Sequence, residues 1–243
     1  MAPSFSPASN QYVPPVTKDK ESSDWAELPP ELVFLILFRI GTVDILKNAQ
    51  KVCRSWRRVS KDPSMWRKIE IRSRGITDYE CDCFCRQAVD RSEGGLVELD
   101  IRDLVGDDSL LAYIADRAGN LRCLKLTACS PVTPKGLVNV VMKLQFLEDV
   151  EISHSFSELD LKPIGYCCPL LKTLKLSRIR FCWGLESDSE ALAIAETMPQ
   201  LRRLELSGIF LTNTGLNAIL QNCIRLQHFD LRECSNINLV GGS

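Results

Sequence analysis

The sequence predicts an α/β protein in which an N-terminal helical bundle is fused to a solenoid of repeated strand–helix units. Two observations predict this arrangement. Between positions 28 and 71, apolar residues recur at the three- and four-residue spacing of short amphipathic helices. From position 96 onward, an L-x-x-L-x-L pattern occurs six times, with its first leucines 25, 26, 24, 30 and 25 residues apart. Repeats of this length are typical of solenoids.

The composition bounds the kinds of partner and the cellular setting. The 243 residues include 30 Lys and Arg against 31 Asp and Glu, a net charge of -1. This balance gives no general reason to expect a nucleic acid or an anionic membrane as a partner. The longest apolar run, residues 32–38, is too short to cross a bilayer, and residues 1–12 lack the features of a secretory signal. We therefore expect a soluble intracellular protein whose eleven cysteines are reduced thiols.

Three segments follow from the composition and patterning along the chain. Residues 1–23 are rich in Pro, Ser and other polar residues, which predicts a disordered arm. Residues 24–68 form the predicted bundle, and residues 69–243 form a solenoid of six to seven units. The last strand is followed by only twelve residues, so we expect the C-terminal end of the solenoid to be uncapped, with Phe229, Leu231, Ile237 and Leu239 partly exposed there.

The predicted bundle has more apolar positions than so small a core can hold. Its first helix begins near Pro29 and Pro30, and Gly41 and Thr42 are placed to end it and to cap the next helix. A third helix centres on Trp56, which we expect in the core. One apolar face should remain open for a partner. The first helix carries an apolar stripe of Leu28, Leu32, Ile36, Leu37 and Ile40.

The order of motifs in this bundle resembles the F-box. The motifs are Leu28-Pro29-x-Glu31-Leu32, Ile36-Leu37, Val52-Cys53-x-x-Trp56-Arg57 and Asp62-Pro63-x-x-Trp66. The resemblance implies binding to the Skp-type adaptor of cullin–RING ubiquitin ligases. It implies adaptor contacts by Leu28, Pro29, Leu32, Ile36, Leu37, Val52 and Cys53.

The repeat is similar to a leucine-rich repeat, in which each unit is a short parallel strand with a return segment that is often helical. Strands then line a concave face and helices a convex one. Trp66, Ile69 and Ile71 fit an atypical first unit, so Trp66 should belong to both cores, with no flexible linker between them. The six regular triplets are Leu96/Leu99/Ile101, Leu121/Leu124/Leu126, Leu147/Val150/Ile152, Leu171/Leu174/Leu176, Leu201/Leu204/Leu206 and Leu226/Phe229/Leu231.

Capping residues predict where the return helices begin. Thr77 with Glu80 predicts a capping box for a helix over Asp78–Arg91, and Ser187 with Glu190 predicts another before residues 191–198. Thr133 and Thr212 mark two further helix starts. Cys129, Cys168 and Cys234 stand at positions that resemble the cysteine-containing subclass of these repeats, the type that commonly accompanies F-boxes.

No arrangement of residues predicts catalysis, a cofactor or a metal. Cys81-x-Cys83-x-Cys85 is the only dense cysteine group, and on a helix only Cys81 and Cys85 share a face. Buried structural thiols are the simpler interpretation, and metal binding or redox sensing is the alternative. The two histidines, His154 and His228, accompany no nucleophile motif. We therefore expect no catalytic residue, no metal and no cofactor.

The outward residues of the strands and one long loop are the candidate target-binding positions. On the strands these are Asp100, Lys125, Glu151, Lys175, Arg203 and Glu205, whose mixed charge favours a protein over a nucleic acid. An ordinary solvated face is the alternative. Phe181 and Trp183 lie in the loop of the 30-residue unit, where they either anchor a partner or cover the solenoid edge.

Taken from about residue 25 to 240, the chain resembles a plant F-box/leucine-rich-repeat protein. The resemblance implies a non-catalytic substrate receptor of a Skp–cullin–F-box ubiquitin ligase. Its partners would be the Skp-type adaptor, through it the cullin and RING subunits, and a target protein marked for degradation. It also implies a nuclear or cytoplasmic location. Two alternatives stay open, namely an adaptor-binding scaffold that drives no ubiquitination and a ligand-dependent sensor.

Overall fold

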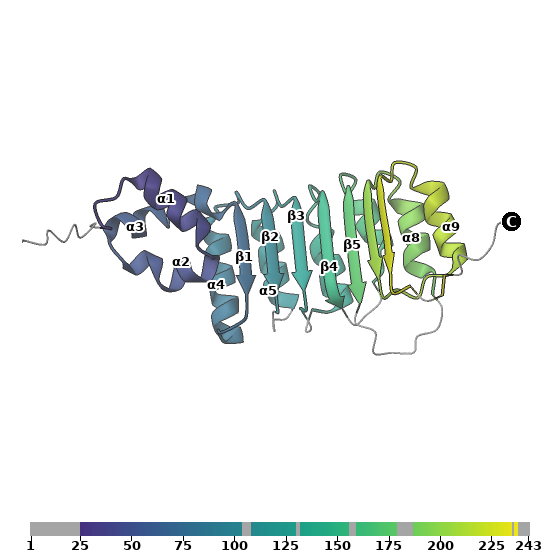
Figure 1. Cartoon of the computed structure of the whole chain (residues 1–243), viewed down its shortest axis with the longest axis horizontal. Helices are drawn as coiled ribbons and strands as arrows, with labels where there is room; N and C mark the ends of the chain where they lie inside the picture. Colours follow the sequence, from purple (N-terminus) through teal and green to yellow (C-terminus); the bar gives the residue numbers. More distant parts are fainter. Residues whose placement is uncertain are drawn as a thin grey trace, which may run out of the picture.

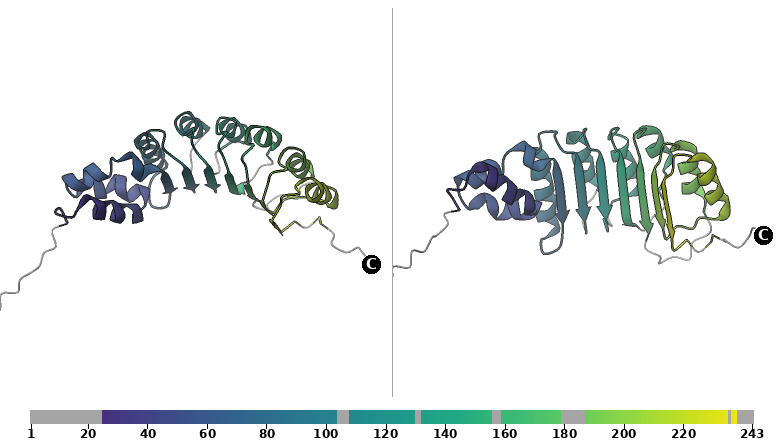
Figure 2. Two further views of the ribbon diagram at one scale, coloured as in Figure 1. Left: turned by 90° about the horizontal axis from the view of Figure 1, so that it is seen from above. Right: turned by 45° about the horizontal axis from the view of Figure 1, so that its top comes forward.

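The computed structural model describes residues 25–103, 108–129, 132–155, 159–178, 187–234 and 236–237. A helical bundle stands at one end and continues into a seven-stranded parallel sheet whose strand order follows the chain, β1 to β7 (Figure 1). The sheet lines the inner side of an arc and the helices line its outer side (Figure 2). The predicted α/β solenoid is therefore confirmed. The predicted arm, residues 1–23, lies outside the described residues.

The bundle contains three short α-helices and two 3-10 turns. Its core includes Trp56, as predicted, and the indole Nε1 of Trp56 donates a hydrogen bond of 3.0 Å to the carbonyl of Trp25. The two indole rings meet edge to face, with their centroids 6.5 Å apart. The elements are α1 (Pro30–Arg39), α2 (Thr42–Lys47), η1 (Ala49–Lys51), α3 (Arg54–Val59) and η2 (Pro63–Trp66).

Two local predictions for the bundle are wrong. The predicted stripe of α1 does not form one face, because Leu37 packs in the core beside Val33 while Leu32 is exposed. Thr42 does not cap α2, because Gly41 occupies the N-cap position and Thr42 is the first helical residue. The Thr42 hydroxyl instead accepts a hydrogen bond of 3.2 Å from the backbone N–H of Glu70, which ties the bundle to the first strand.

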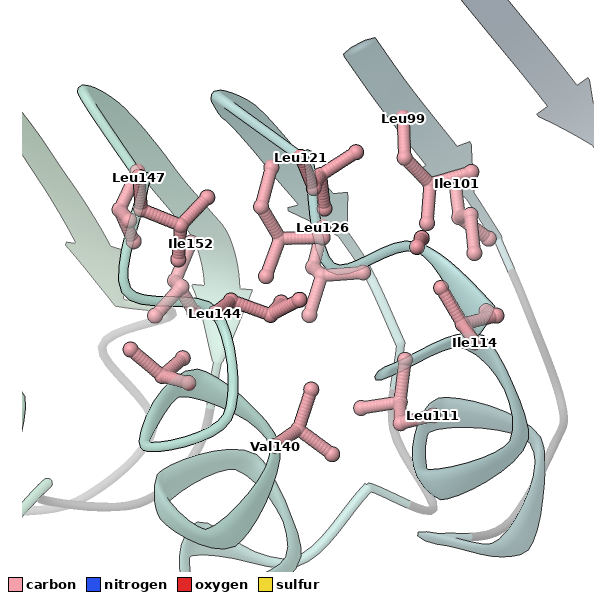
Figure 3. Close-up of a cluster of buried hydrophobic side chains, with 14 of the residues drawn as sticks. Leu99, Ile101, Leu111, Ile114, Leu121, Leu126, Val140, Leu144, Leu147 and Ile152 are labelled. Atoms are coloured by element: carbon pink, nitrogen blue, oxygen red, sulfur yellow. The ribbon is translucent and has the colours of Figure 1, made fainter. Parts of the chain in front are cut away.

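The second and third residues of each predicted triplet lie in a strand, and the apolar positions of neighbouring strands stand in register. Ile101 pairs with Leu126, and Leu126 with Ile152, so the apolar side chains form continuous ladders under the sheet (Figure 3). Because each strand buries its ladder residues against those of the next unit, one unit alone could not form this core. The strands are β1 (Lys68–Arg72), β2 (Glu98–Arg102), β3 (Cys123–Thr127), β4 (Asp149–Ser155), β5 (Thr173–Arg178), β6 (Arg203–Ser207) and β7 (His228–Arg232).

The last strand is less covered than the others. Phe229 and Leu231 are half-buried, whereas the matching Leu204 and Leu206 of β6 are buried, because β6 is the only strand that pairs with β7 among the described residues. The predicted partial exposure of Phe229 and Leu231 is therefore confirmed, and Ile237 is also half-buried. Leu239 lies outside the described residues.

The return helices begin at the predicted caps, with one exception. Thr77 and Glu80 form the predicted capping box, and Thr133 and Thr212 cap their helices. The helix after residue 187 begins instead at Ser189, with Asp188 at its N-cap position, and Glu190 turns into the core. There Glu190 contacts the guanidinium of Arg178 and accepts a hydrogen bond of 2.9 Å from the N–H of Leu159. The helices are α4 (Asp78–Arg91), α5 (Asp108–Arg117), α6 (Pro134–Val141), α7 (Lys162–Cys167), α8 (Ser189–Thr197) and α9 (Asn213–Asn222).

An aspartate–threonine–glycine contact joins the helix start of one unit to that of another. Asp188 accepts hydrogen bonds from the N–H of Thr212 at 2.8 Å and from its hydroxyl at 2.6 Å. Gly215 leaves room for this carboxylate, since a Cβ at that position would lie 2.4 Å from Asp188 Oδ1. The same contact is made by Asp108, Thr133 and Gly136.

The bundle and the solenoid share one core at Trp66. This side chain is buried, and its Nε1 donates a hydrogen bond of 3.0 Å to the carbonyl of Ser60. Arg91, from α4 of the first unit, stacks over the Trp66 ring at 5.4 Å and donates hydrogen bonds to Ser60 and to the side chain of Gln50. The prediction that Trp66 belongs to both cores is confirmed.

Candidate binding surfaces

Helix α1 is apolar on two opposite sides, and the bundle covers only one of them. Val33 and Leu37 face the core, whereas Leu35 and Phe38 on the other side are 57% and 61% exposed. Leu32 is also exposed, and Phe38 stacks on Phe34 with ring centroids 6.3 Å apart. A helix that is apolar all round is normally buried all round. The outer side of α1, consisting of Leu32, Leu35 and Phe38, is here called the outer apolar face.

The residues predicted to contact an adaptor divide into three groups. Pro29, Leu32 and Val52 are exposed, and Leu28, Ile36 and Cys53 are half-buried. Leu37 is 0% exposed, so the prediction that it contacts a partner is wrong, because it fills the bundle core. Leu35 and Phe38 were missed, although an unbroken apolar run over residues 32–38 already indicated a helix with no polar side.

The second surface is the concave face of the sheet, where charged residues line up from strand to strand. The register aligns Lys125 with Glu151, Glu151 with Lys175, and Lys175 with Glu205. Arg203 is exposed, and Lys125, Glu151, Lys175 and Glu205 are half-buried. These five predicted target-binding residues therefore stand together on one face. Phe181 and Trp183 lie outside the described residues.

Asp100 is the exception among the predicted concave-face residues. It is only 4% exposed, because Arg102 covers it with a bidentate ion pair. The Arg102 Nε lies 3.0 Å from Asp100 Oδ1, and its Nη2 lies 2.6 Å from Oδ2. The hydrogen bond and the charge of Asp100 raise the pKa of the Arg102 guanidinium above its usual range. The prediction that Asp100 contacts a target directly is therefore corrected, since Arg102 is the group that this position presents.

Shared ion pairs link the charges along the face. Glu98 accepts hydrogen bonds from Lys68 and Lys125, each at 3.0 Å. Partial burial raises the pKa of Glu98, but the two lysines outweigh it and the net pKa lies below its usual value. Glu205 is likewise placed between Lys175 at 3.2 Å and Arg203 at 2.9 Å.

Two of the three cysteines of α4 are buried in the solenoid, and Cys83 is half-buried. Cys81 and Cys85 share the inner side of the helix, where desolvation raises the pKa of the Cys81 thiol to about 11 and that of Cys85 further. Such thiols are poor nucleophiles and poor metal ligands. Across the described ranges, no group of three or more His, Cys, Asp or Glu side chains could hold a metal ion. Within the same ranges, no helix is long and apolar enough to span a bilayer.

Comparison with known proteins identifies the family of the chain. Residues 25–72, which include the bundle and β1, match the F-box-like domain family. The chain is 53% identical over 238 residues to F-box protein SKIP19 of Arabidopsis thaliana, covering 96% of this chain and 77% of that protein. The chain belongs to the plant F-box/leucine-rich-repeat family. A second relative within it, F-box/LRR-repeat protein 9 of Arabidopsis thaliana, is 48% identical, with 98% of each chain covered.

Solved structures agree with the fold of this F-box/leucine-rich-repeat chain. The crystal structure of the yeast Rad7 and Elc1 complex is similar with a TM-score of 0.56 at 17% identity. The match covers 86% of this chain and 56% of that one. At this identity the likeness supports the architecture alone, a bundle followed by a leucine-rich-repeat solenoid.

Proposed function

We propose that this F-box/leucine-rich-repeat protein is the substrate-recognition subunit of a Skp–cullin–F-box ubiquitin ligase. F-box proteins are generally substrate receptors of such ligases, and members of this family are typically non-catalytic. In the proposed complex the bundle binds the Skp-type adaptor and the concave face binds a target protein, which is ubiquitinated and degraded by the proteasome.

The outer apolar face carries the adaptor half of this proposal. Leu35 and Phe38 keep more than half of their surface in contact with water, while the opposite side of the same helix is fully packed. Exposed apolar patches on a folded domain are typical of protein interfaces, because covering them releases ordered water. A helix of the adaptor packed across α1 would give these side chains the neighbours they lack.

The proposed catalytic contribution is proximity. A target held on the concave face is presented to the ubiquitin-charged enzyme carried by the cullin and RING subunits, which raises the effective concentration of its lysines. This role requires no nucleophile, cofactor or metal from the chain. It also requires that the target and the adaptor occupy different surfaces, as the concave face and the outer side of α1 do.

The decisive experiment combines recovery of the complex with transfer of ubiquitin. The tagged chain should co-purify with the adaptor and the cullin, and this complex should transfer ubiquitin to a protein bound by the repeats. Leu32→Asp, on the exposed side of α1, should abolish recovery of both subunits while the circular dichroism of the repeats is retained. Adaptor recovery without cullin would instead support a scaffold that drives no ubiquitination. Retained adaptor binding by folded Leu32→Asp would overturn the proposal.

A nuclear or cytoplasmic site of action is part of the proposal. It rests on the family's role in ubiquitin-dependent turnover, and imaging of a fluorescent fusion of the chain tests it. Accumulation of the fusion in any other compartment would count against it.

A further inference from the structure

Strand β4, the middle strand of the concave sheet, carries two carboxylates that form no ion pair with a basic side chain among the described residues. Asp149 and Glu151 point outward from alternate positions of the strand, and neither lies within ion-pair distance of a basic group there. Within the part of the chain that the structure describes, Glu151 accepts a hydrogen bond only from the hydroxyl of Ser153, at 3.5 Å. The other carboxylates at the outward positions of this face are all paired.

The cations next to β4 are engaged by carboxylates of more distant strands. In the register, Lys125 and Lys175 stand on either side of Glu151. Lys125 turns away to Glu98, at 3.0 Å, and Lys175 turns away to Glu205, at 3.2 Å. The remaining outward cations of the face, Lys68, Arg72, Arg102, Arg203 and Arg232, are likewise paired with carboxylates outside β4.

The two free carboxylates border a hollow in the sheet. A depression of about 390 Å³ is lined by Asp149 and Glu151, by the neutral side chains Cys123 and Thr173, and by charged side chains that are already paired, namely Glu98, Lys125, Lys175 and Arg203. Glu151 also lines an adjoining depression of about 150 Å³. The hollow is large enough to take side chains of a partner, and Asp149 and Glu151 are the charged groups of its lining that form no ion pair among the described residues.

We infer that the target segment bound on the concave face presents two basic side chains, lysine or arginine, to Asp149 and Glu151. This inference rests on the proposed function and names the chemistry of its target. Alternate residues of a strand are about 6.6 Å apart. The same spacing separates alternate side chains of an extended segment, so a lysine at every second residue matches the pair. An apolar or acidic segment would cover the two carboxylates without neutralising them, which opposes binding and selects against such partners.

A peptide-binding experiment tests the inference on the full chain in complex with its adaptor. The probe is a fluorescein-labelled twelve-residue peptide of alternating Lys and Ser, and its counterpart alternates Glu and Ser. Binding is measured by anisotropy for the wild type, for Asp149→Asn with Glu151→Gln, and for a control, Asp116→Asn with Glu196→Gln. The control changes the net charge equally, but its carboxylates are exposed on α5 and α8, where they pair with Lys143 and Lys162 of neighbouring units.

The expected result separates local recognition from net charge. The Lys peptide should bind the wild type and the control alike. It should bind the β4 variant about tenfold more weakly, as expected for two lost charged contacts in a partly enclosed site. The β4 variant should have the same urea midpoint of unfolding as the wild type, since it breaks no ion pair among the described residues.

Three outcomes would overturn the inference. In the first, both double variants bind the Lys peptide more weakly than the wild type does, and to the same degree. In the second, the wild type binds the Glu peptide more tightly than the Lys peptide. In the third, the wild type does not bind the Lys peptide. Recovery of the cullin with the same variants is measured in parallel. If wild-type complexes lack cullin, the proposed function fails whatever the peptides show. If cullin is recovered but the peptides behave as in one of the three outcomes, only this inference fails.

Discussion

Truncating the outer apolar face should weaken adaptor binding without unfolding the protein. The change is Leu35→Ala together with Phe38→Ala. Burying a leucine or phenylalanine completely stabilises an assembly by about 1.5–3 kcal/mol. These side chains are 57% and 61% exposed in the free chain, so a partner can bury somewhat more than half of each. We expect a joint loss of about 2–3 kcal/mol, or a 30- to 150-fold rise in Kd.

The assay is calorimetric titration of the chain with the purified adaptor. Leu192→Ala with Leu220→Ala is the matched control, since these leucines of α8 and α9 are also about half exposed but belong to the solenoid. The control should bind the adaptor as the wild type does. Both double variants should keep a free energy of unfolding within about 1 kcal/mol of the wild type, because Phe38 loses only a stacking contact with Phe34. Unchanged adaptor affinity in the α1 variant, or an equal loss in the control, would refute the assignment of this face.

Three further predictions concern stability. Trp56→Ala should lower the free energy of unfolding by about 3–5 kcal/mol, because it leaves a cavity in the bundle core and breaks the hydrogen bond to Trp25. Urea denaturation measures this loss, and a loss below about 1 kcal/mol would contradict the packing described for Trp56. Gly215→Ala should lower the melting temperature, since its Cβ would lie 2.4 Å from Asp188 Oδ1, and Gly41→Ala, with no atom near its Cβ, is the control. Glu98 has a pKa lowered in the folded state, so its contribution to stability is present above its ordinary value of 4.5 and is lost as the pH falls below it. Glu98→Gln should therefore unfold with a weaker dependence on pH in acid, and identical acid profiles would exclude this contribution.

The repeats were the part most open to prediction from sequence. A leucine at the same place in six consecutive units can satisfy only one arrangement, so the register from Leu99 to Leu206 followed from spacing alone. The helix caps at Thr77 and Thr133 were equally local, since donor and acceptor lie within one turn. Elements of this kind are decided by residues close together in the sequence.

The errors have the opposite origin. Helix α1 is apolar on every side, so its composition could not show whether Leu32 or Leu37 faces the core. Glu190 was expected at a helix start, but Arg178 draws its carboxylate inward from a neighbouring element. Asp100 was expected to face a partner, but Arg102, two residues along the same strand, folds back over it. In each case a contact between side chains decided the outcome, and no periodicity records such contacts.

The buried Trp66 makes the F-box and the first repeat a single rigid piece. With Ser60 and Arg91 bonded around that indole, the solenoid cannot swivel about a hinge at this point without opening its core. The number of strands between the bundle and a bound target therefore sets the distance between the target and the adaptor. Each repeat sets its part of the concave face about 4.8 Å further from the outer side of α1 than the repeat before it. A target bound on β4 would lie at a fixed distance from the adaptor. Inserting one whole repeat before β4 would increase that distance by one strand spacing. The choice of which lysine on the target meets the ubiquitin-charged enzyme would then depend on the number of repeats as well as on the residues that grip the target.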